Sequence, residues 1–537
     1  MRTRRIVAIA AAFLALPFVL SCTSDEATPT PSPTPMLPAT EVAPDTGVLN
    51  LASPLTLNHW DVHLSPSHVL ASWGPGIVYS RLLRFQSGPD VETPTQATEC
   101  DLCESWEQVD ATTYLFRLRE GVLWHDVAPV NGRELVAQDV LYSLRRQLTP
   151  SYPNAGILEA VHTIEAEDRY TLRITLRSPD ADFLASLASG FTKVVAPEAV
   201  ELNGDLREGP VIGSGPWLWD GTRDDIGYYF KANPAYYESD LPGLDRLNLI
   251  TIVDEFTRMA AFRTRRLDLL EAVPADFNTI REGHPDVGFQ VYPEAGSGLE
   301  LALNTNSPPL DDLAVRRAVF AALDPWEARD AVWDGLGFVS LGMPVAGPGW
   351  LLPEEEMRAH LALPGARGMV NDLPEESRSL TLTVADYGDA YLEYGRRLAE
   401  QLSRQGFRVD TRTVTPTDYP HQVWYNGDYQ AFVGPIAPIS TPNMYLRSVL
   451  HSGGEGNTHG YRSDALDALI EEQAAKQDAA WRQELALAIQ RHVMEQAVRF
   501  MPQTRESTWV WWPWVEGFHA NLSFGEYFHL ARLRVES

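Results

Sequence analysis

The chain has 537 residues, of which 44% are hydrophobic, so it can bury more than one core and is not a single small module. It carries 43 basic and 72 acidic residues, which gives a formal net charge of -29. A surface with this excess of acid repels phosphate backbones and anionic lipid heads, so the composition argues against nucleic acid as a partner.

The first residues are typical of an export signal. Arg2, Arg4 and Arg5 form a basic start, and an apolar run over residues 6–19 is too short to span a bilayer comfortably. We therefore predict a signal peptide over residues 1–21. The sequence VLSC that ends at Cys22 is similar to the lipobox of bacterial lipoproteins, which implies a lipid on Cys22.

A proline-rich segment follows Cys22 and precedes the folded chain. Residues 28–35 read TPTPSPTP, and prolines favour extended geometry without a hydrogen-bond ladder, so we predict a semi-rigid tether over residues 22–46. No later stretch has the 18–20 uninterrupted apolar residues of a membrane helix. We expect the chain to contact the membrane through its lipid alone.

The remaining two cysteines, Cys100 and Cys103, are three positions apart. At this spacing their α carbons can reach disulfide distance, and an exported protein can keep such a bond, so we predict a structural disulfide. A thioredoxin-like redox pair is the alternative, although the strand-to-helix context of a redox enzyme is not evident here. A zinc site would need two further soft ligands, and none is close in sequence.

The hydrophobic pattern after the tether alternates between strand and helix periods. Period-two alternation predicts strands over residues 114–119 and 170–177. Between them, apolar residues at three- and four-residue steps predict an amphipathic helix over residues 137–148. This order is typical of a packed α/β unit.

The second half of the chain shows the same alternation. Strands are predicted over residues 380–385 and 407–412, on either side of a helix over residues 391–405 that Gly406 would end. This is a βαβ-like unit. Further helices are predicted over residues 254–267, 311–323 and 463–477.

Several short blocks resemble, in order, the family 5 extracellular solute-binding proteins, which serve ABC importers of oligopeptides, dipeptides and nickel. The blocks are VYSRLLRF at 78–85, CESW at 103–106, YLFRLREGVLWHD at 114–126, AQDVLYSL at 137–144, GSGPW at 213–217, NPAY at 233–236, LNT at 303–305, VRRA at 315–318, ALD at 322–324, GY at 460–461 and LD at 466–467. One block alone would say little, but together they cover nearly everything after the tether.

The resemblance implies an α/β fold with two lobes, the periplasmic-binding-protein-like type II fold, with an extra subdomain in the first lobe. Lobe I would comprise residues 47–84, 211–302 and 507–537, the extra subdomain residues 85–210, and lobe II residues 303–506. A ligand that touches both lobes would favour a closed form. The family resemblance implies that the closed form then docks on the permease subunits of an ABC importer.

The sequence lacks the motifs of common catalysts. We find no Gly-x-Ser-x-Gly elbow, no His-Glu-x-x-His helix, no phosphate-cradling loop and no dinucleotide fingerprint, so we expect a binding protein without a cofactor rather than an enzyme. An envelope hydrolase of peptides or glycans is the rival interpretation. We expect a monomer on the outer face of the membrane. A receptor that signals rather than transports is a further alternative, because it would have the same fold.

One group of candidate ligand contacts lies near the start of the folded chain, where the resemblance implies the mouth of the cleft: His59, Trp60, Asp61 and His63. With His68 the histidines could suit nickel or zinc, because four-residue spacing places two on one helix face. The neighbouring Ser65-Pro66 instead favours a loop, so we expect hydrogen bonds to an organic ligand and no metal.

A second group lies in the predicted lobe II: Trp424, Tyr425, Asn443, Tyr445 and Arg447. Peptide receptors of the family commonly hold the ligand's α-amine with an aspartate, but Pro438 stands where the aspartate is expected. Another acidic residue would have to substitute, or the ligand has no amine. A peptide or similar organic solute is the first expectation, with a carbohydrate or a nickel complex as alternatives. Trp509 and the nearby Trp511, Trp512 and Trp514 are expected to pack lobe I.

Overall fold

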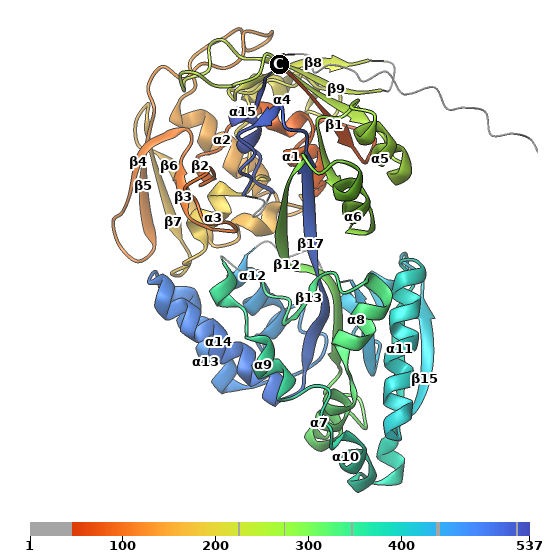
Figure 1. The fold of residues 1–537 in the computed structure, drawn as a ribbon. Helices are drawn as coiled ribbons and strands as arrows, with labels where there is room; N and C mark the ends of the chain where they lie inside the picture. Colours follow the sequence, from red (N-terminus) through yellow and green to blue (C-terminus); the bar gives the residue numbers. More distant parts are fainter. Residues whose placement is uncertain are drawn as a thin grey trace, which may run out of the picture. The chain divides into compact units, whose positions relative to one another are not determined.

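The computed structural model describes residues 46–223, 226–272, 274–344, 347–435, 441–521 and 525–536 (Figure 1). The predicted signal peptide, Cys22, most of the tether and Pro438 lie outside these residues. Within them, no helix combines the length and the apolar character needed to cross a bilayer.

The main sheet of the described chain has eleven strands in one hydrogen-bonded array. In spatial order these are β15 (Arg408–Val414), β14 (Ser379–Ala385), β16 (Ala431–Pro435), β12 (Gly288–Leu303), β17 (Arg499–Trp511), β11 (Leu269–Ala272), β1 (Val48–Ser53), β10 (Arg246–Thr251), β9 (Gly227–Ala232) and β8 (Trp217–Thr222), with β13 (Phe338–Ser340) paired to β17 off this path. The sheet is mixed, because β1 pairs with β10 in parallel while β12 and β17 are antiparallel.

The two long strands β12 and β17 connect the two halves of this sheet (Figure 1). Their pairing has a register shift between Pro293 and Gly298, and the two segments on either side of the shift pair separately. Tyr292, before the shift, belongs to one large hydrophobic core, and Leu299, after it, belongs to another. The same pair of strands is therefore shared by two cores.

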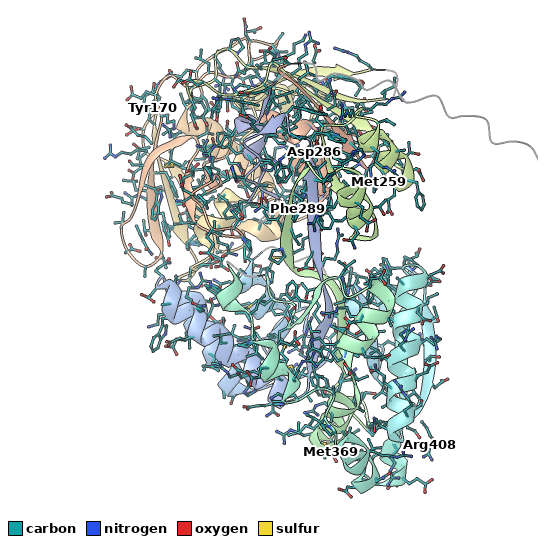
Figure 2. The ribbon with its side chains drawn as sticks, in the orientation of Figure 1. Tyr170, Met259, Asp286, Phe289, Met369 and Arg408 are labelled. Carbon is teal, nitrogen blue, oxygen red and sulfur yellow. A yellow bond between two sulfur atoms is a disulfide. The ribbon has the colours of Figure 1, made fainter. Side chains whose placement is uncertain are left out.

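The two large cores draw on different parts of the chain. The first contains buried side chains from residues 49–292 and 509–535, and the second contains those from residues 299–500. A smaller core includes Met259, labelled in Figure 2, with Phe262 and Trp512.

A four-stranded antiparallel sheet accounts for the first predicted strands. Its order is β4 (Cys103–Gln108), β5 (Thr113–Leu118), β7 (Thr171–Leu176) and β6 (Val161–Ala166). The predicted helix between β5 and β7 is confirmed as α2 (Ala137–Gln147). The sulfur atoms of Cys100 and Cys103 are bonded at the start of β4, with their α carbons 5.0 Å apart.

The predicted βαβ-like unit is also confirmed. Strands β14 and β15 are parallel neighbours, and α11 (Asp389–Gln405) connects them. The helix ends at Gly406, whose φ of 114° lies in the left-handed region that glycine adopts without strain.

Three other predicted helices form, with different ends. The prediction for residues 254–267 is wrong at its C-terminus: α5 (Glu255–Arg263) stops because Arg265 has a φ of 59°, which a right-handed helix cannot include. Helix α7 (Leu313–Ala322) begins after Asp312, whose side chain accepts a hydrogen bond from the Ala314 amide. Helix α13 (Asp464–Ala475) lies within its predicted range.

The remaining elements are shorter or were not predicted. The helices are α1 (His68–Ser72), α3 (Phe183–Ala188), α4 (Pro197–Asn203), α6 (Pro274–Gly283), α8 (Pro325–Trp333), α9 (Glu354–Arg358), α10 (Ala366–Asp372), α12 (Pro442–Tyr445), α14 (Ala479–Glu495) and α15 (His529–Arg532). Strands β2 (Leu83–Phe85) and β3 (Thr98–Cys100) form one small sheet, and β18 (Val515–Glu516) and β19 (Arg534–Val535) form another.

Buried histidines make folding stability depend on pH. Burial lowers the pKa of His459 from 6.5 to about 4, so below pH 6.5 the unfolded chain binds a proton that the folded chain does not. The stabilising effect of His459 is therefore complete above pH 6.5 and is lost as the pH falls towards 4. We expect the difference in unfolding free energy between wild type and His459→Gln to shrink by about 1.4 kcal/mol per pH unit over this window.

Urea unfolding at pH 7 and pH 5 measures that difference. The exposed His519→Gln substitution is the matched control. A difference for His459→Gln that is the same at both pH values would contradict the expectation.

Candidate functional site

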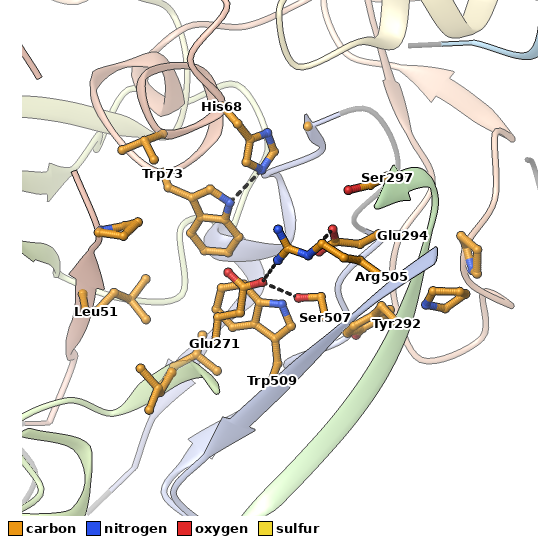
Figure 3. Close-up of a pocket in the computed structure, with 18 of the residues that line it drawn as sticks. Leu51, His68, Trp73, Glu271, Tyr292, Glu294, Ser297, Arg505, Ser507 and Trp509 are labelled. Atoms are coloured by element: carbon orange, nitrogen blue, oxygen red, sulfur yellow. Dashed lines mark hydrogen bonds and ion pairs between the residues drawn. The ribbon is translucent and has the colours of Figure 1, made fainter. Parts of the chain in front are cut away.

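A cavity of about 520 Å³ lies beside β12 and β17 (Figure 3). Its described walls come from β1, α1, α5, β11, β12 and β17, with further residues from loops. The residues that matter for its chemistry are Leu51, His68, Trp73, Arg258, Glu271, Tyr292, Glu294, Ser297, Pro344, Arg505, Ser507 and Trp509.

One wall of the cavity is aromatic. The rings of Trp73 and Trp509 stack with centroids 4.8 Å apart, and the Trp73 Nε1 donates a hydrogen bond to His68 Nε2 over 3.1 Å (Figure 3). The His68 residue is exposed at the cavity, but the protein atoms packed around its ring and the Lys193 charge lower its pKa from 6.5 to about 4, so the ring is neutral at pH 7 and can accept this bond. The wall therefore offers flat apolar surface and no charge.

The other side of the cavity is charged. Arg505 lies between two carboxylates: its guanidinium is 3.7 Å from Glu271 Oε1 and 3.4 Å from Glu294 Oε2 (Figure 3). The Ser507 hydroxyl donates to Glu271 Oε1 over 2.7 Å. Burial raises the pKa of Glu294 although the Arg505 charge opposes this, so this carboxylate is not fully compensated by its surroundings.

Strand geometry explains why these side chains meet. Arg505, Ser507 and Trp509 alternate along β17 and so share one face of the sheet. Cross-strand pairing then brings Glu271 opposite Trp509 and Tyr292 opposite Ser507. Strands β11 and β12, which are close in sequence, and the distant strand β17 thus build the charged side of the cavity.

The candidate contacts from the start of the folded chain lie elsewhere. Asp61 and His63 are fully buried: Asp61 forms an ion pair with Arg146 at 2.5 Å, and His63 Nε2 is 3.0 Å from the Lys193 carbonyl oxygen. These side chains meet interior partners rather than the cavity.

The other two residues of this group are half-buried. The His59 Nδ1 accepts a hydrogen bond from the Asp61 amide over 3.2 Å, and Trp60 packs against Trp219 and Tyr228. Neither lines the cavity.

The candidate contacts from the predicted lobe II are also outside the cavity walls. Tyr425 is 73% exposed, and Trp424 is half-buried against Tyr419. The buried Tyr445 donates to the Leu341 carbonyl over 2.5 Å, and Arg447 pairs with Glu471 at 2.8 Å.

Asn443 takes part in a buried network with residues 180–182. Its backbone amide donates to Asp182 Oδ2 over 2.7 Å, and its side-chain Nδ2 donates to Asp180 Oδ1 over 2.5 Å. Arg482 donates to Asp182 Oδ1 over 2.5 Å, and the Ala181 amide donates to the Ala474 carbonyl. The network ties a loop of the first half of the chain to the part of the second half that contains α12, α13 and α14.

The sequence reasoning missed the charged cavity residues Glu271, Glu294 and Arg505, and it considered His68 only as a metal ligand. Trp509 was expected to pack a core, and it does so while also lining the cavity. The one signal available was the polar alternation RESTW at residues 505–509, which places three side chains on one strand face. Among the described residues, no group of three or more His, Cys, Asp or Glu side chains could hold a metal ion.

Comparison with known proteins defines the class. The structure of HbpA2 from Haemophilus parasuis matches with a TM-score of 0.75 at 21% identity, covering 92% of this chain and all of that one. The periplasmic binding protein DppA from Helicobacter pylori, solved in complex with the peptide STSA, matches with a TM-score of 0.70 at 22% identity, covering 91% and 98% of the two chains. The fold is thus the type II fold of periplasmic binding proteins.

The sequence comparison gives the family. Residues 98–457, well over half of the chain, match the model of the bacterial extracellular solute-binding proteins, family 5 Middle. Over 457 residues the chain is 26% identical to Di/tripeptide-binding protein 1 of Pseudomonas aeruginosa, covering 79% of this chain and 82% of that one. Over 437 residues it is 25% identical to Heme-binding protein A of Haemophilus influenzae, covering 74% and 76%.

The chain belongs to the family 5 extracellular solute-binding proteins. Proteins of this family bind solutes, peptides among them, outside the cytoplasm and deliver them to ABC importers. The function of this chain is accordingly to capture a solute for import.

Proposed function

We propose that the cavity beside β12 and β17 is the solute site, and that its ligand is a peptide or a similar organic solute. The observation that carries this proposal is the position of the cavity on the two strands that both large cores share. A ligand held there contacts the segment through which the two halves of the sheet are joined. The similarity of the chain to Di/tripeptide-binding protein 1 supports a peptide as the ligand.

The mechanism follows from this position. The two proposed lobes move about β12 and β17. Lobe I comprises residues 47–84, 211–302 and 507–537 and carries the extra subdomain at 85–210. Lobe II comprises residues 303–506. A ligand that contacts both lobes stabilises the closed form by its differential affinity. The closed form then docks on the permease subunits of an ABC importer and releases its ligand unaltered, so the protein is not an enzyme.

The residues expected from sequence take different roles in this proposal. Tyr425 and Trp424 have exposed surface and are available to a ligand when the lobes close. His59, Trp60 and Arg447 are partly exposed and remain candidate contacts. We assign the buried Asp61, His63, Asn443 and Tyr445 to the support of neighbouring segments.

We further propose that the monomeric protein is held at the outer face of the membrane by a lipid on Cys22. The basic start, the apolar run and the VLSC sequence support this assignment. Mass spectrometry of the membrane fraction tests it: the lipid mass should be lost, and the protein released, when Cys22 is replaced by Ser.

A thermal-shift screen over peptides, oligosaccharides and nickel salts tests the solute class. A ligand that binds only the folded protein adds about 2.7 kcal/mol of stability at a concentration of 100 times Kd. We expect peptides to raise the Tm and mass spectrometry to recover them unchanged. Recovery of a cleaved peptide would favour the envelope hydrolase, and a shift with sugars or nickel alone would contradict the peptide assignment.

A bulky side chain that fills the cavity should weaken the binding of peptides. We expect Ser297→Trp to weaken peptide binding by about tenfold or more, because the new ring takes the ligand's volume beside Glu294. Calorimetric titration measures the Kd. Ser178→Trp, at an exposed position, is the control and should bind as wild type does. Unchanged affinity in Ser297→Trp would place the solute site elsewhere.

A further inference from the structure

We propose that the ligand carries a cationic group, an ammonium or a guanidinium, which binds between Glu271 and Glu294. The ligand also presents a hydrogen-bond acceptor to Trp509. This inference rests on the proposed function, because it concerns the same cavity. It names the chemistry that the cavity selects.

The charges at the polar side of the cavity are not balanced around Arg505. Two carboxylates, Glu271 and Glu294, face one guanidinium, that of Arg505, and both ion pairs are longer than a direct hydrogen bond. The other arginine of the lining, Arg258, donates to the backbone carbonyls of Ile252 and Val253. Arg258 keeps its positive charge in another part of the lining, while the group formed by Arg505, Glu271 and Glu294 has two negative charges against one positive charge.

The same arrangement disfavours an anionic ligand group at this place. A ligand carboxylate that approached Arg505 would meet the carboxylates on both sides of it, and like charges repel strongly where water is partly excluded. A cation between the carboxylates would instead complete their pairing. The raised pKa of Glu294 agrees with this, because burial and the nearby Glu271 charge together outweigh the opposing Arg505 charge.

The indole N–H of Trp509 is a second feature of the cavity, independent of the carboxylates. Trp509 is only 6% exposed and lines the cavity, and its Nε1 has no hydrogen-bond partner in the described part of the protein. A buried indole N–H without an acceptor is costly, so an acceptor that a ligand brings would relieve this cost once the side chains that cover the Nε1 atom move aside. A carbonyl oxygen close to the cationic group has the required chemistry.

Two parts of a peptide could supply the cation, its α-ammonium or a basic side chain. Both share the same chemistry, and the stacked rings of Trp73 and Trp509 can support either by contact with the neighbouring apolar atoms. The peptide series of the test separates the two sources.

Calorimetric titration with five tripeptides tests the inference: Ala-Lys-Ala, Ala-norleucine-Ala, Ala-Glu-Ala and the N-acetylated forms of the first two. Wild type should bind at least one cationic form about tenfold or more tightly than the matched form without that cation, and Ala-Glu-Ala no more tightly than Ala-norleucine-Ala. Loss of the preference on N-acetylation identifies the α-ammonium. Loss on exchanging lysine for norleucine identifies the side chain.

The variants Glu271→Gln and Glu294→Gln keep shape but remove one negative charge each. Each should weaken binding of the preferred cation about tenfold or more and change the affinity for acetylated Ala-norleucine-Ala less than about twofold. Glu282→Gln, at an exposed position on α6, is the matched control. Circular dichroism verifies that each variant is folded.

Two results would overturn the inference alone, and a third would overturn it together with the proposed function. Equal affinity of wild type for all five peptides, the acetylated forms included, would show that the charges do not select, while leaving the proposed function intact. If the folded variants Glu271→Gln and Glu294→Gln both bind the preferred cation as tightly as wild type does, the two carboxylates do not hold it. Failure of every tripeptide to bind would contradict the proposed peptide function together with the inference.

Discussion

Glu526→Ala should lower the free energy of unfolding by about 3–5 kcal/mol, because it leaves a buried guanidinium without its partner. The side chains of Glu526 and Arg81 are both 0% exposed, and two parallel hydrogen bonds of 2.8 and 2.9 Å join them. Glu526 also accepts hydrogen bonds from the backbone amides of Phe85, Tyr527 and Phe528. The substitution thus removes five bonds at one buried point.

Urea unfolding followed by circular dichroism measures this loss. The control is Glu354→Ala, which removes a surface ion pair with Arg358 whose two side chains are about half exposed, and should cost less than about 1 kcal/mol. Losses of equal size in the two variants would refute the expectation.

The effect of Glu526 also depends on pH. Burial alone would raise the pKa of this carboxyl, but the Arg81 charge and the backbone donors outweigh it and lower the pKa from 4.5 to about 2. The stabilising effect of Glu526 is therefore complete above pH 4.5 and is lost as the pH falls towards 2. The difference in unfolding free energy between wild type and Glu526→Ala should therefore become smaller as the pH falls from 4.5 towards 2.

Asp182→Ala is the substitution with the second largest expected effect, about 3 kcal/mol or more of unfolding free energy. Asp182 is 1% exposed and Arg482 9%, so removing the carboxylate leaves a nearly buried guanidinium. The Asn443 amide loses its acceptor at the same time. Because the network joins the proposed extra subdomain to the proposed lobe II, the variant should also loosen the connection between them.

Unfolding free energies measure the loss of stability in Asp182→Ala, and hydrogen exchange measures the loosening of the connection to the proposed lobe II. The double variant Asp182→Ala, Arg482→Ala should be less destabilised than the sum of its single variants, because the second change removes the unpaired charge. Glu471→Ala, which breaks the more exposed pair with Arg447, serves as the control and should cost less than about 1 kcal/mol. Additive losses, with hydrogen exchange in α13 and α14 unchanged, would disprove the role of the network.

Local patterns in the sequence were sufficient for many secondary elements. The period-two alternation at residues 114–119 is strand β5, and the apolar spacing at residues 137–148 is helix α2. Gly406 ends α11 as expected from its conformational freedom. These features depend on interactions within a few residues, so the sequence contains the information directly. The helix end at Arg263 was missed because a single residue's backbone conformation decides it.

The partners of the charged residues could not be obtained in this way. Asp61 and His63 were expected at the mouth of a cleft because the family resemblance implies that position for their segment. In the folded chain Asp61 pairs with Arg146, 85 positions later, and His63 with the Lys193 carbonyl, 130 positions later. Nothing in the local sequence distinguishes a polar residue with a distant interior partner from one that faces a ligand.

The sequence by itself thus determined the alternation of strands and helices and the family resemblance, and it is the sole basis for the predicted export signal. The tertiary structure alone decided where the proposed solute cavity lies. The cavity exists because β11, β12 and β17 pair, and this pairing sets Glu271 opposite Trp509 although 238 positions separate them. Strand pairing between distant segments is fixed by the burial of whole sheet faces, a collective property that no short stretch of sequence contains.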